Sequence, residues 1–536
     1  MNKGYLNLVL HAHLPYIRHS EHDYFLEENW FYEAVTESYI PLLDVFEGLL
    51  NDNIEFNITL SLSPTLVEMF NDPLLRERCL RYINNLIELS EKEIMRTKGD
   101  SSFEPLARMY NERFRRTKSL YEETYKKDLT SAFRRLQNTG KVEIITSSAT
   151  HAYLPALSIY PQAVRAQIRV AVSSHRKNFG KVPEGIWLPE CGYFPDLERI
   201  LKECSIKFFF METHGILNGK PAPKYNVYKP VSCPSGVIAF GRDLESSKQV
   251  WSSVEGYPGD FDYRDFYRDL GFDLPLNYVR PYIHPDGIRT YTGIKYYCVT
   301  GKTDDKTPYI REKALARAAE HADNFILTRK QQIELLTRTS DFSPVITAPY
   351  DAELFGHWWF EGPDWLNLLL RKISSDSKGT LRTTTASKYL KENSGFQTIN
   401  PSMSSWGHNG YNEVWLNASN NWVYRHLHKA VERMTELSEM FPKAGGLLQR
   451  ALNQAAREIL LSQHSDWAFI MKTGAASEYA AKRITEHIER FNNLYEAVKS
   501  GNIDAEKLSS IEEQDNVFSD MDYRVYSDHE SSLSKG

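Results

Sequence analysis

Short β-like runs alternate with helical stretches over roughly 350 residues, and this alternation constrains the fold more than any other feature of the chain. Runs rich in Val, Ile and Phe predict strands at Tyr5–Leu10, Phe56–Leu62, Val142–Thr146, Gly185–Leu188, Lys207–Met211, Val237–Phe240 and Val345–Ala348. Apolar residues at helical spacing predict helices at Pro161–Phe179, Asp196–Cys204, Arg311–Thr337 and Trp365–Ser374. The alternation therefore favours a parallel α/β architecture.

Polar and aromatic clusters follow one predicted strand after another. These clusters are HAHLPY, SATHAYLP, WLPECGY, METHG and APYDAELFGHWW. The active site of a (β/α) barrel is built from loops at the carboxyl ends of many strands. An open doubly wound sheet gathers its functional groups at one switch point and usually carries a Gly-rich phosphate turn, and neither GxGxxG nor GxxxxGK[ST] occurs here. The sequence therefore predicts a barrel.

Two regions depart from this alternation. The segment 74–137 is charged and helical without a convincing strand, and from about residue 418 one amphipathic helical segment follows another. The predicted domains are a barrel at 1–73 and 138–400, a helical insertion at 74–137 and a C-terminal helical domain at 401–536. The polar residues from 514 onward are expected to dock loosely or fray.

Charge and cysteine content narrow the class of protein. The formal net charge is -6 and no Lys/Arg-rich stripe stands out, so nucleic acid is not expected as a partner. The five cysteines form no CxxC pair, which fits a reducing compartment rather than a disulfide framework or a zinc ribbon. The start MNKGYLNLVLHAH is too short in apolar residues for a signal peptide, and no run is long enough for a membrane helix. We therefore expect a cytoplasmic protein without a membrane partner.

The motif HAH places His11 and His13 two residues apart. On a strand this spacing points both rings to the same face. One hypothesis is a metal pair, whose other ligands would come from His151, His214, Asp351 or His357. The second is that both rings hydrogen-bond a polyhydroxylated substrate, and the third is a structural pair. The local sequence leaves the three open.

Two carboxylates are placed at strand ends in a way that suggests catalysis. Glu190 lies in a Pro- and Gly-framed turn of WLPECGY, and Asp351 follows the strand VITAPY. Retaining glycoside cleavage needs two carboxyl groups about 5 Å apart, one of them with a raised pKa. Each could instead be a buried carboxylate that orients a loop. Glu353 is a rival for Asp351, because an extended chain sends both to one face, and Glu212 is a weaker candidate.

Aromatic residues make up 12% of the chain, and eight of its ten tryptophans lie at residue 251 or later. Aromatic faces bind the apolar faces of sugars, although most such rings in a large protein simply fill the core. Six tryptophans occur in Gly-, Asn- or Ser-containing segments rather than helical stripes. These six are Trp251, Trp358, Trp359, Trp406, Trp415 and Trp467. The segments SSWGHNGYNEVWLN and SQHSDWAF, which contain the last three, are expected to form the lips of a long sugar groove.

Five motifs in order, HAHLP, GIWLPECGY, FFFMETHG, APYDAELFGHWW and SSWGHNGYNEVWLN, resemble those of glycoside hydrolase family 57. The resemblance runs over nearly the whole chain. Within that family, the segments ESSKQVW, GYPGD, YRDFYRD and TGIKYY are similar to those of α-1,4-glucan branching enzymes and of closely related bacterial α-amylases.

The resemblance implies an incomplete (β/α)7 barrel with a helical insertion and a C-terminal helical domain. It makes Glu190 the nucleophile and Asp351 the general acid/base of a retaining mechanism that needs no metal or other cofactor. It also implies a set of glucan-binding residues, to which we add the aromatic neighbours of the two carboxylates. This set is His11, His13, His151, Trp187, Arg264, Trp358, Trp406 and Asp466.

The expected activity is therefore α-1,4-glucan branching by a monomer or small homo-oligomer that acts on amylose, glycogen or similar chains. The branching enzymes of the family carry a loop tyrosine after the METHG strand, whereas KPVSCPSGVIAF has none and presents Ser232 or a neighbour instead. A weaker lid would admit water and favour hydrolysis. The alternatives are an α-amylase or 4-α-glucanotransferase that uses the same pair, and, more distantly, a non-catalytic glucan-binding protein.

Overall fold

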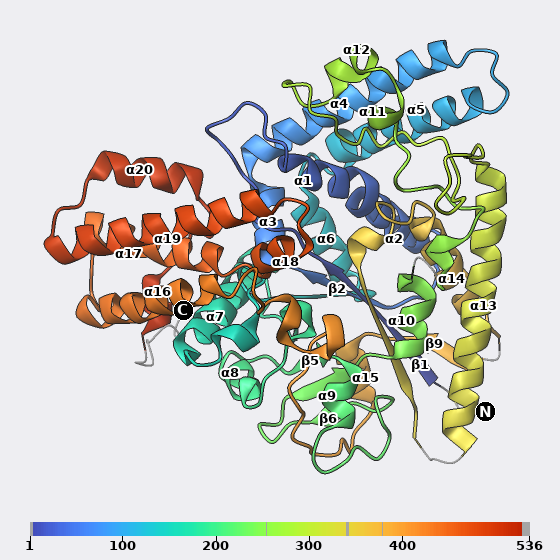
Figure 1. Ribbon diagram of the computed structural model, residues 1–536. Helices are drawn as coiled ribbons and strands as arrows, with labels where there is room; N and C mark the ends of the chain where they lie inside the picture. The colour runs from blue at the N-terminus through green and yellow to red at the C-terminus, as the bar shows by residue number, and fades with distance from the viewer. Residues whose placement is uncertain (1–3, 253–254, 339–341, 378, 528–536) are drawn as a thin grey trace.

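The computed structural model describes residues 4–252, 255–338, 342–377 and 379–527. Strands lie at the centre of the molecule with helices packed around them, and the C-terminal helices gather on one side (Figure 1). Among the described residues, no helix combines the length and apolar character that a membrane crossing requires. The chain is thus an α/β protein with a helical C-terminal region.

The strands form two sheets joined by a single parallel bridge. In the first sheet the order is β3 (Val142–Ile145), β2 (Ile58–Leu62), β1 (Gly4–Ala12), β8 (Val345–Asp351), and β9 (Leu381–Thr383) pairs with the start of β1. In the second the order is β4 (Gly185–Trp187), β5 (Phe208–Met211), β7 (Ile238–Gly241), β6 (Val231–Ser232). The bridge between Thr146 and Ile186 connects β3 to β4. Every pairing between strands is parallel except that of β6 with β7.

Strand β1 lies at the centre of the first sheet because its sequence, GYLNLVLHA, is almost continuously apolar. All of its residues except Tyr5 are buried, as expected for a parallel strand covered on both faces. The seven strands predicted from sequence are confirmed. The two that were missed, β6 and β9, have two and three residues, too few to show a period. β8 also extends three residues beyond the predicted end and includes Asp351.

The predicted helices around the sheets are confirmed as α7 (Pro161–Phe179), α8 (Leu197–Glu203), α13 (Arg311–Arg338) and α14 (Gly362–Ser374). Helix α7 shows why the boundaries could be predicted. Pro161 occupies its first position, where the missing N–H costs nothing. Gly180 ends it with φ of 73°, the left-handed conformation that favours glycine.

The charged segment after β2 is helical, as predicted. Helices α4 (Pro73–Arg96) and α5 (Glu104–Ser119) pack against each other as an antiparallel pair at one end of the molecule (Figure 1). Helix α6 (Leu129–Asn138) instead packs against β3 and α7, beside the sheet. The pair α4–α5 is therefore the part of this segment that projects from the sheet.

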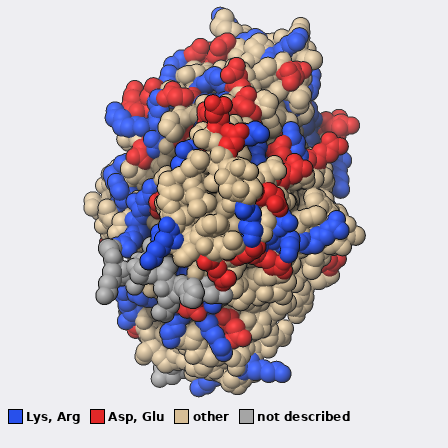
Figure 2. Space-filling model, turned by 90° about the vertical axis from the view of Figure 1, so that its left-hand side faces the viewer, with Lys and Arg blue, Asp and Glu red and all other residues tan. Residues whose placement is uncertain are grey.

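The C-terminal region is helical, as predicted, with α16 (Trp422–Met440), α17 (Gly446–Ser462), α18 (Ser465–Thr473), α19 (Ser477–Ser500) and α20 (Ala505–Gln514). On the side of the molecule that carries them, Lys/Arg and Asp/Glu side chains are interspersed (Figure 2). The prediction that the chain docks loosely from residue 514 onward is wrong for its described part. Val517, Phe518 and Tyr526 are at most 1% exposed, because apolar residues interspersed among the polar ones anchor this segment. Residues 528–536 lie outside the described part.

Candidate active site

The sequence-predicted residues converge at the carboxyl ends of the strands. His11 lies at the end of β1 and His13 directly follows the strand, Asp351 ends β8, and Glu190 lies in the turn after β4. His11 pairs in register with Asp351 on one side and with Ser61 of β2 on the other. Residues that are up to 340 positions apart in sequence therefore meet at one edge, because parallel strands end together.

Glu190 is held by backbone and side-chain contacts. It occupies the 3-10 turn Pro189–Cys191 with φ of 62° and ψ of 23°, a left-handed conformation that is unusual for a residue other than glycine. Its Oε2 accepts a hydrogen bond of 2.8 Å from the indole N–H of Trp406, and its Oε1 accepts one of 2.9 Å from the hydroxyl of Ser465. The two donors orient the carboxylate and stabilise its ionised form.

Asp351 lies in a different electrostatic environment. No hydrogen bond from another described residue reaches its carboxylate. Burial and the charge of Glu190 raise the pKa of Asp351 to about 7, and Arg242 opposes this shift. Burial and the charge of Asp466 raise the pKa of Glu190 to about 7 as well, while its two hydrogen bonds lower it. Because two neighbouring carboxyls resist double ionisation, the hydrogen bonds favour the negative charge on Glu190 and the proton on Asp351.

The rival carboxylates have fixed partners. Glu353 accepts a 3.1 Å hydrogen bond from the backbone N–H of His13 and another from the hydroxyl of Tyr39, and burial raises its pKa to about 8. Glu212 caps helix α9 (Thr213–Leu217) and forms a 3.0 Å ion pair with Arg242. Both therefore brace the site, whereas Asp351 is the carboxyl without such partners.

The histidines form a connected chain beside Glu190. Nε2 of His11 lies 2.9 Å from Nε2 of His151, and Nδ1 of His151 lies 2.8 Å from the Ser465 hydroxyl that contacts Glu190. The rings of His13 and His151 stack with centroids 3.7 Å apart, which confirms that His11 and His13 face the same side. Burial holds the pKa of His11 and of His151 well below the usual range, so both are neutral near pH 7.

Asp466 completes this chain from the C-terminal region. Its Oδ2 lies 2.9 Å from Nε2 of His13 and 2.8 Å from Nδ1 of His464. These contacts hold its pKa well below the usual range in spite of burial. The His13 and Asp466 side chains are 9% and 23% exposed, so both remain partly accessible to solvent.

The residues that could hold a metal ion differ from those predicted from the sequence. His13, His151 and Asp466 place ligand atoms within 4.8 Å of one another. His214 and His357 are engaged elsewhere, with the carbonyl of Gly410 and the carboxylate of Glu37 at 2.8 and 2.6 Å. The atoms of His13 and Asp466 that would bind a cation already bond to each other.

A groove of about 790 Å³ opens beside Asp351. Trp251, Tyr267 and Trp358 line it and are 45%, 72% and 51% exposed. Phe266 supports Trp358 by stacking at 4.3 Å, and Arg264 lines the groove with its guanidinium 4.1 Å above the ring of Phe360. The groove thus offers several aromatic faces to a ligand that reaches Asp351.

Four tryptophans that were not expected to belong to the core are buried, which corrects the expectation. Trp187 is fully buried, with its ring 4.9 Å from that of His11 and 5.0 Å from that of Trp406, so it supports the site from below. Trp359, Trp415 and Trp467 are at most 1% exposed and belong to the core. Trp467 lies within helix α18, and for Trp359 and Trp415 a turn position did not mean exposure. Ser232 lies in the edge strand β6, where it is bridged to Thr398.

Sequence reasoning missed Ser465 and the hydrogen bond from Trp406 to Glu190. Ser465 contacts both Glu190 and His151, yet a serine between His464 and Asp466 carries no distinguishing local signal. Trp406 was predicted as part of a sugar groove, and its backbone N–H also donates to the carbonyl of Glu190 at 3.0 Å. Only the folded chain brings these residues, more than 200 positions away, to the carboxylate.

Comparisons with known proteins agree with this geometry. The profile of glycosyl hydrolase family 57 matches residues 7–402, and that of the C-terminal region of 1,4-alpha-glucan branching enzymes matches residues 426–526. The chain is 34% identical over 553 residues to a 1,4-alpha-glucan branching enzyme of Thermococcus kodakarensis, covering 96% of this chain and 77% of that protein.

Two solved structures are similar over nearly the full length. The alpha-amylase AmyC from Thermotoga maritima superposes with a TM-score of 0.91 at 43% identity, covering 98% of this chain and 99% of that one. A branching enzyme from Pyrococcus horikoshii superposes with a TM-score of 0.88 at 34% identity, covering 98% and 97%. The chain therefore belongs to glycosyl hydrolase family 57.

Proposed function

We propose that this protein is a retaining α-1,4-glucan branching enzyme that uses Glu190 as nucleophile and Asp351 as general acid/base. One observation carries the assignment of roles. Glu190 accepts two hydrogen bonds that favour its anion, while Asp351 has a pKa raised to about 7 and no described hydrogen-bond donor. A nucleophile must be ionised and an acid must hold its proton, so the two environments suit the two roles.

The first step breaks an α-1,4 bond. A carboxylate oxygen of Glu190 attacks the anomeric carbon, and the carboxyl of Asp351 gives its proton to the departing glycosidic oxygen. The C–O bond breaks as a glycosyl ester to Glu190 forms, with inversion at the anomeric carbon. Asp351 is left ionised beside a now neutral ester, which lowers its pKa and prepares it to act as a base.

The second step makes the branch. The 6-hydroxyl of an acceptor glucan loses its proton to Asp351 and attacks the anomeric carbon, breaking the ester. This second inversion restores the α configuration and forms an α-1,6 bond. The acceptor enters on the side from which the first chain left, which is the side of Asp351. The aromatic groove that Trp358, Tyr267 and Trp251 line on that side suits both chains.

The histidine chain and Asp466 are proposed to bind the sugar held at Glu190. His13 and Asp466 remain partly accessible to solvent, and neutral His11 and His151 fix the orientation of His13 and Ser465 from behind. Arg264 is proposed to bind glucan in the groove. No metal has a part in this scheme.

We also propose the finer architecture implied by the motifs, an incomplete (β/α)7 barrel. Its seven parallel strands follow in the order β8, β1, β2, β3, β4, β5, β7. The ring would stay open between β7 and β8, because these two strands do not pair. A 2.9 Å hydrogen bond connects the N–H of Asp243, two residues after β7, to the carbonyl of Thr347 in β8. The domain limits 74–137 and 401–536 belong to this proposal. The five unpaired thiols support a cytoplasmic location.

An α-amylase is the second candidate, and two observations favour it. The alpha-amylase from Thermotoga maritima is 43% identical to this chain, against 34% for the branching enzymes named above. Ser232 lies in an edge strand and supplies no aromatic side chain to the carboxylate pair. In this candidate the ester on Glu190 is opened by water, and all residue roles are otherwise unchanged.

Incubation with amylose distinguishes a branching enzyme from an α-amylase. The product is divided, and one half is digested with a debranching enzyme that cuts only α-1,6 bonds. A branching enzyme yields new short chains after debranching, with few new reducing ends before it. Reducing ends that rise without new branches would reject branching as the main activity.

A further inference from the structure

The active site is assembled from two parts of the chain, and short hydrogen bonds join them, among them that between His151 and Ser465. Ser465 of the C-terminal region donates to Glu190 at 2.9 Å, and Asp466 contacts His13, directly after β1, at 2.9 Å. Both C-terminal residues lie in the first turn of α18. Reacting groups lose efficiency steeply with displacements near 1 Å. The placement of α18 against β1 and β4 must therefore be fixed by other contacts.

The segment 513–518, which spans the last two residues of α20 and the chain that follows, makes such contacts on its helical side. Gln454 of α17 donates to the carbonyl of Asp515 at 3.3 Å, and Arg457 donates to the carbonyl of Val517 at 2.8 Å. The carboxylate of Asp515 is 1% exposed and pairs with Arg490 and, at 3.5 Å, with Arg483 of α19. The segment is thus tied to α17 and α19, between which the chain forms α18.

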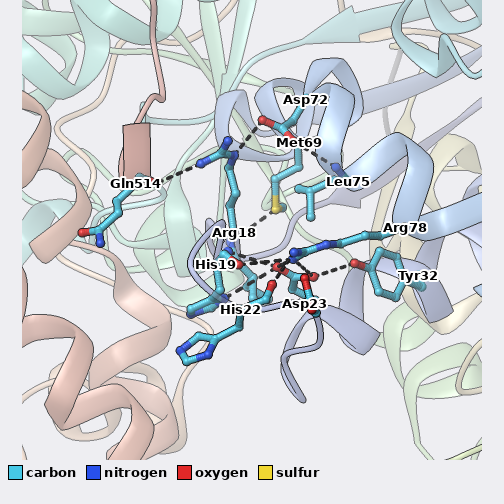
Figure 3. Close-up of polar contacts among 12 residues, drawn as sticks. Arg18, His19, His22, Asp23, Tyr32, Met69, Asp72, Leu75, Arg78 and Gln514 are labelled. Carbon is cyan, nitrogen blue, oxygen red and sulfur yellow. Dashed lines mark hydrogen bonds and ion pairs between the residues drawn. The ribbon is translucent and has the colours of Figure 1, made fainter. Parts of the chain in front are cut away.

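On its other side the same segment contacts the loop that follows His13. The guanidinium of Arg18 donates through Nη1 to the carbonyls of Glu513 and, at 3.3 Å, Gln514 (Figure 3). The hydroxyl of Tyr16 donates to the side chain of Asn516. The loop after β1 therefore contacts the C-terminal segment within five residues of His13.

Arg18 also connects this junction to the helical pair. Its Nε donates at 2.8 Å to Asp72, whose other oxygen caps α4 by accepting from Leu75 N–H at 2.9 Å (Figure 3). The Arg18 and Asp72 side chains are 9% and 4% exposed. A buried guanidinium with all these partners is costly to remove, because carboxylate and carbonyl oxygens would lose their donors.

Arg78 of α4 holds the outer part of the same loop and provides a contrast. It donates to the carbonyls of His19, at 3.2 Å, and His22, and it pairs with Glu28 at 2.7 Å (Figure 3). These partners all lie within the first part of the chain. Arg18, unlike Arg78, joins the loop to the C-terminal segment.

We propose that Arg18 is a positioning residue that aligns α18, with Ser465 and Asp466, against Glu190 and His13. This proposal rests on the catalytic roles given above. Loss of Arg18 releases the segment 513–518 from the loop, so the hydrogen bonds across the site lengthen. Chemistry slows, while the aromatic groove beside Asp351, which draws no residue from α18, still binds glucan.

A change in pH dependence distinguishes positioning from a general loss of stability. Burial raises the pKa of both Glu190 and Asp351, and the charge of Asp466 raises both further. When α18 retreats, Asp466 moves away and water enters. These two losses outweigh the loss of the Ser465 hydrogen bond, which lowers the pKa of Glu190, so both pKa values fall. The bell-shaped pH profile of kcat moves to lower pH as a whole.

The test compares full-length Arg18→Met with Arg18→Lys and with the matched control Arg450→Met. Arg450 of α17 also contacts residues near the C-terminal segment, Glu512 and, at 3.0 Å, Ser509, but it is 46% exposed. For Arg18→Met we expect kcat to fall about 10- to 100-fold with KM changed less than about threefold, and a downward shift of the pH profile. Arg18→Lys recovers part of kcat, and Arg450→Met behaves as the parent. Hydrogen exchange in the peptide around Ser465 increases in Arg18→Met alone.

Parental kcat and pH profile in a folded Arg18→Met protein would overturn the proposal. If Arg18→Met does not fold, Arg18→Lys decides, because it keeps a positive charge beside Asp72 but cannot reach both Asp72 and the carbonyls of Glu513 and Gln514. Parental kcat and pH profile in Arg18→Lys would then reject the positioning role. A parent protein without activity on α-glucans would instead overturn the proposed function, so the two failures are distinguishable.

Discussion

Replacement of Trp406 by Phe tests the electrostatic basis of the nucleophile. The substitution keeps a ring against Trp187 but removes the indole N–H that donates to Glu190 at 2.8 Å. A hydrogen bond to a charged group contributes about 1.5–3 kcal/mol, and one pKa unit corresponds to about 1.4 kcal/mol. The pKa of Glu190, now about 7, should therefore rise by about 1–2 units.

The direction in which the pH profile moves follows from the proposed role of Glu190. The nucleophile acts when ionised, so a higher pKa moves the acid limb of the kcat/KM profile to higher pH. At pH 7 the ionised fraction falls from about one half to between about 1 and 10%, a loss of about 5- to 50-fold. At pH 9 or above the loss attributable to ionisation shrinks severalfold, provided Asp351 still carries enough protons to act.

The assay is the pH dependence of kcat/KM on a soluble maltooligosaccharide. Trp365→Phe is the control, because Trp365 is a fully buried core tryptophan that makes no contact with either carboxylate. Its acid limb should stay at the parental pH even if stability falls. An unchanged acid limb in a folded Trp406→Phe protein would refute the argument that this hydrogen bond favours the Glu190 anion.

Three further predictions follow from the same geometry. Asp351→Asn should raise the unfolding free energy at pH 8 by on the order of 2 kcal/mol while changing it little at pH 4. The reason is that a carboxyl whose folded pKa of about 7 exceeds its ordinary 3.8 destabilises the fold progressively as pH rises from about 4 through 7. Denaturant titrations at both pH values measure this difference. Equal effects at both pH values would contradict the raised pKa. Trp358→Ala should weaken glucan binding by about 1–2 kcal/mol, because its half-exposed ring lines the groove. The measured effect should be a KM increase of about 5- to 30-fold. A KM equal to that of the parent would show that Trp358 does not contribute to glucan binding. Dialysis against a strong chelator should leave kcat unchanged, and a loss restored by one added metal would revive the His13, His151 and Asp466 metal hypothesis.

Much of the fold could be predicted because local patterns are strong where burial is complete. Strand β1 is apolar almost throughout, and α7 carries Pro161 and Gly180 at its two ends. Both features have a direct physical cause, namely burial on both faces and backbone conformation at helix ends. The two-residue strand β6 has no such pattern, because its position is set by pairing with Ile238 and Ala239.

The strand-end positions of the proposed catalytic pair could be predicted for a related reason. Carboxylates at strand ends, framed by Pro, Gly and aromatic residues, stand out from solvated surface acids. What could not be predicted is which groups touch them. Ser465 lies 275 positions from Glu190, and no local pattern reports a contact at that separation. The same limitation led to the wrong prediction for Trp187, which is buried under His11.

The C-terminal segment shows how composition can mislead. The residues after 514 are mostly polar, which suggested a loose tail. Apolar residues among them, including Val517, Phe518 and Tyr526, are nevertheless at most 1% exposed, and Asp515 is buried among arginines. Spacing of these anchors, rather than the average polarity, determines docking.

Trapping the covalent intermediate tests the central claim most directly. A 5-fluoro-α-glucosyl fluoride, which forms the ester quickly and releases it slowly, is incubated with the parent protein and with Glu190→Gln. Peptide mass spectrometry should find the added sugar on the peptide that carries Glu190 in the parent, and none in Glu190→Gln. Labelling of Asp351 or Glu353 in the parent would contradict the account.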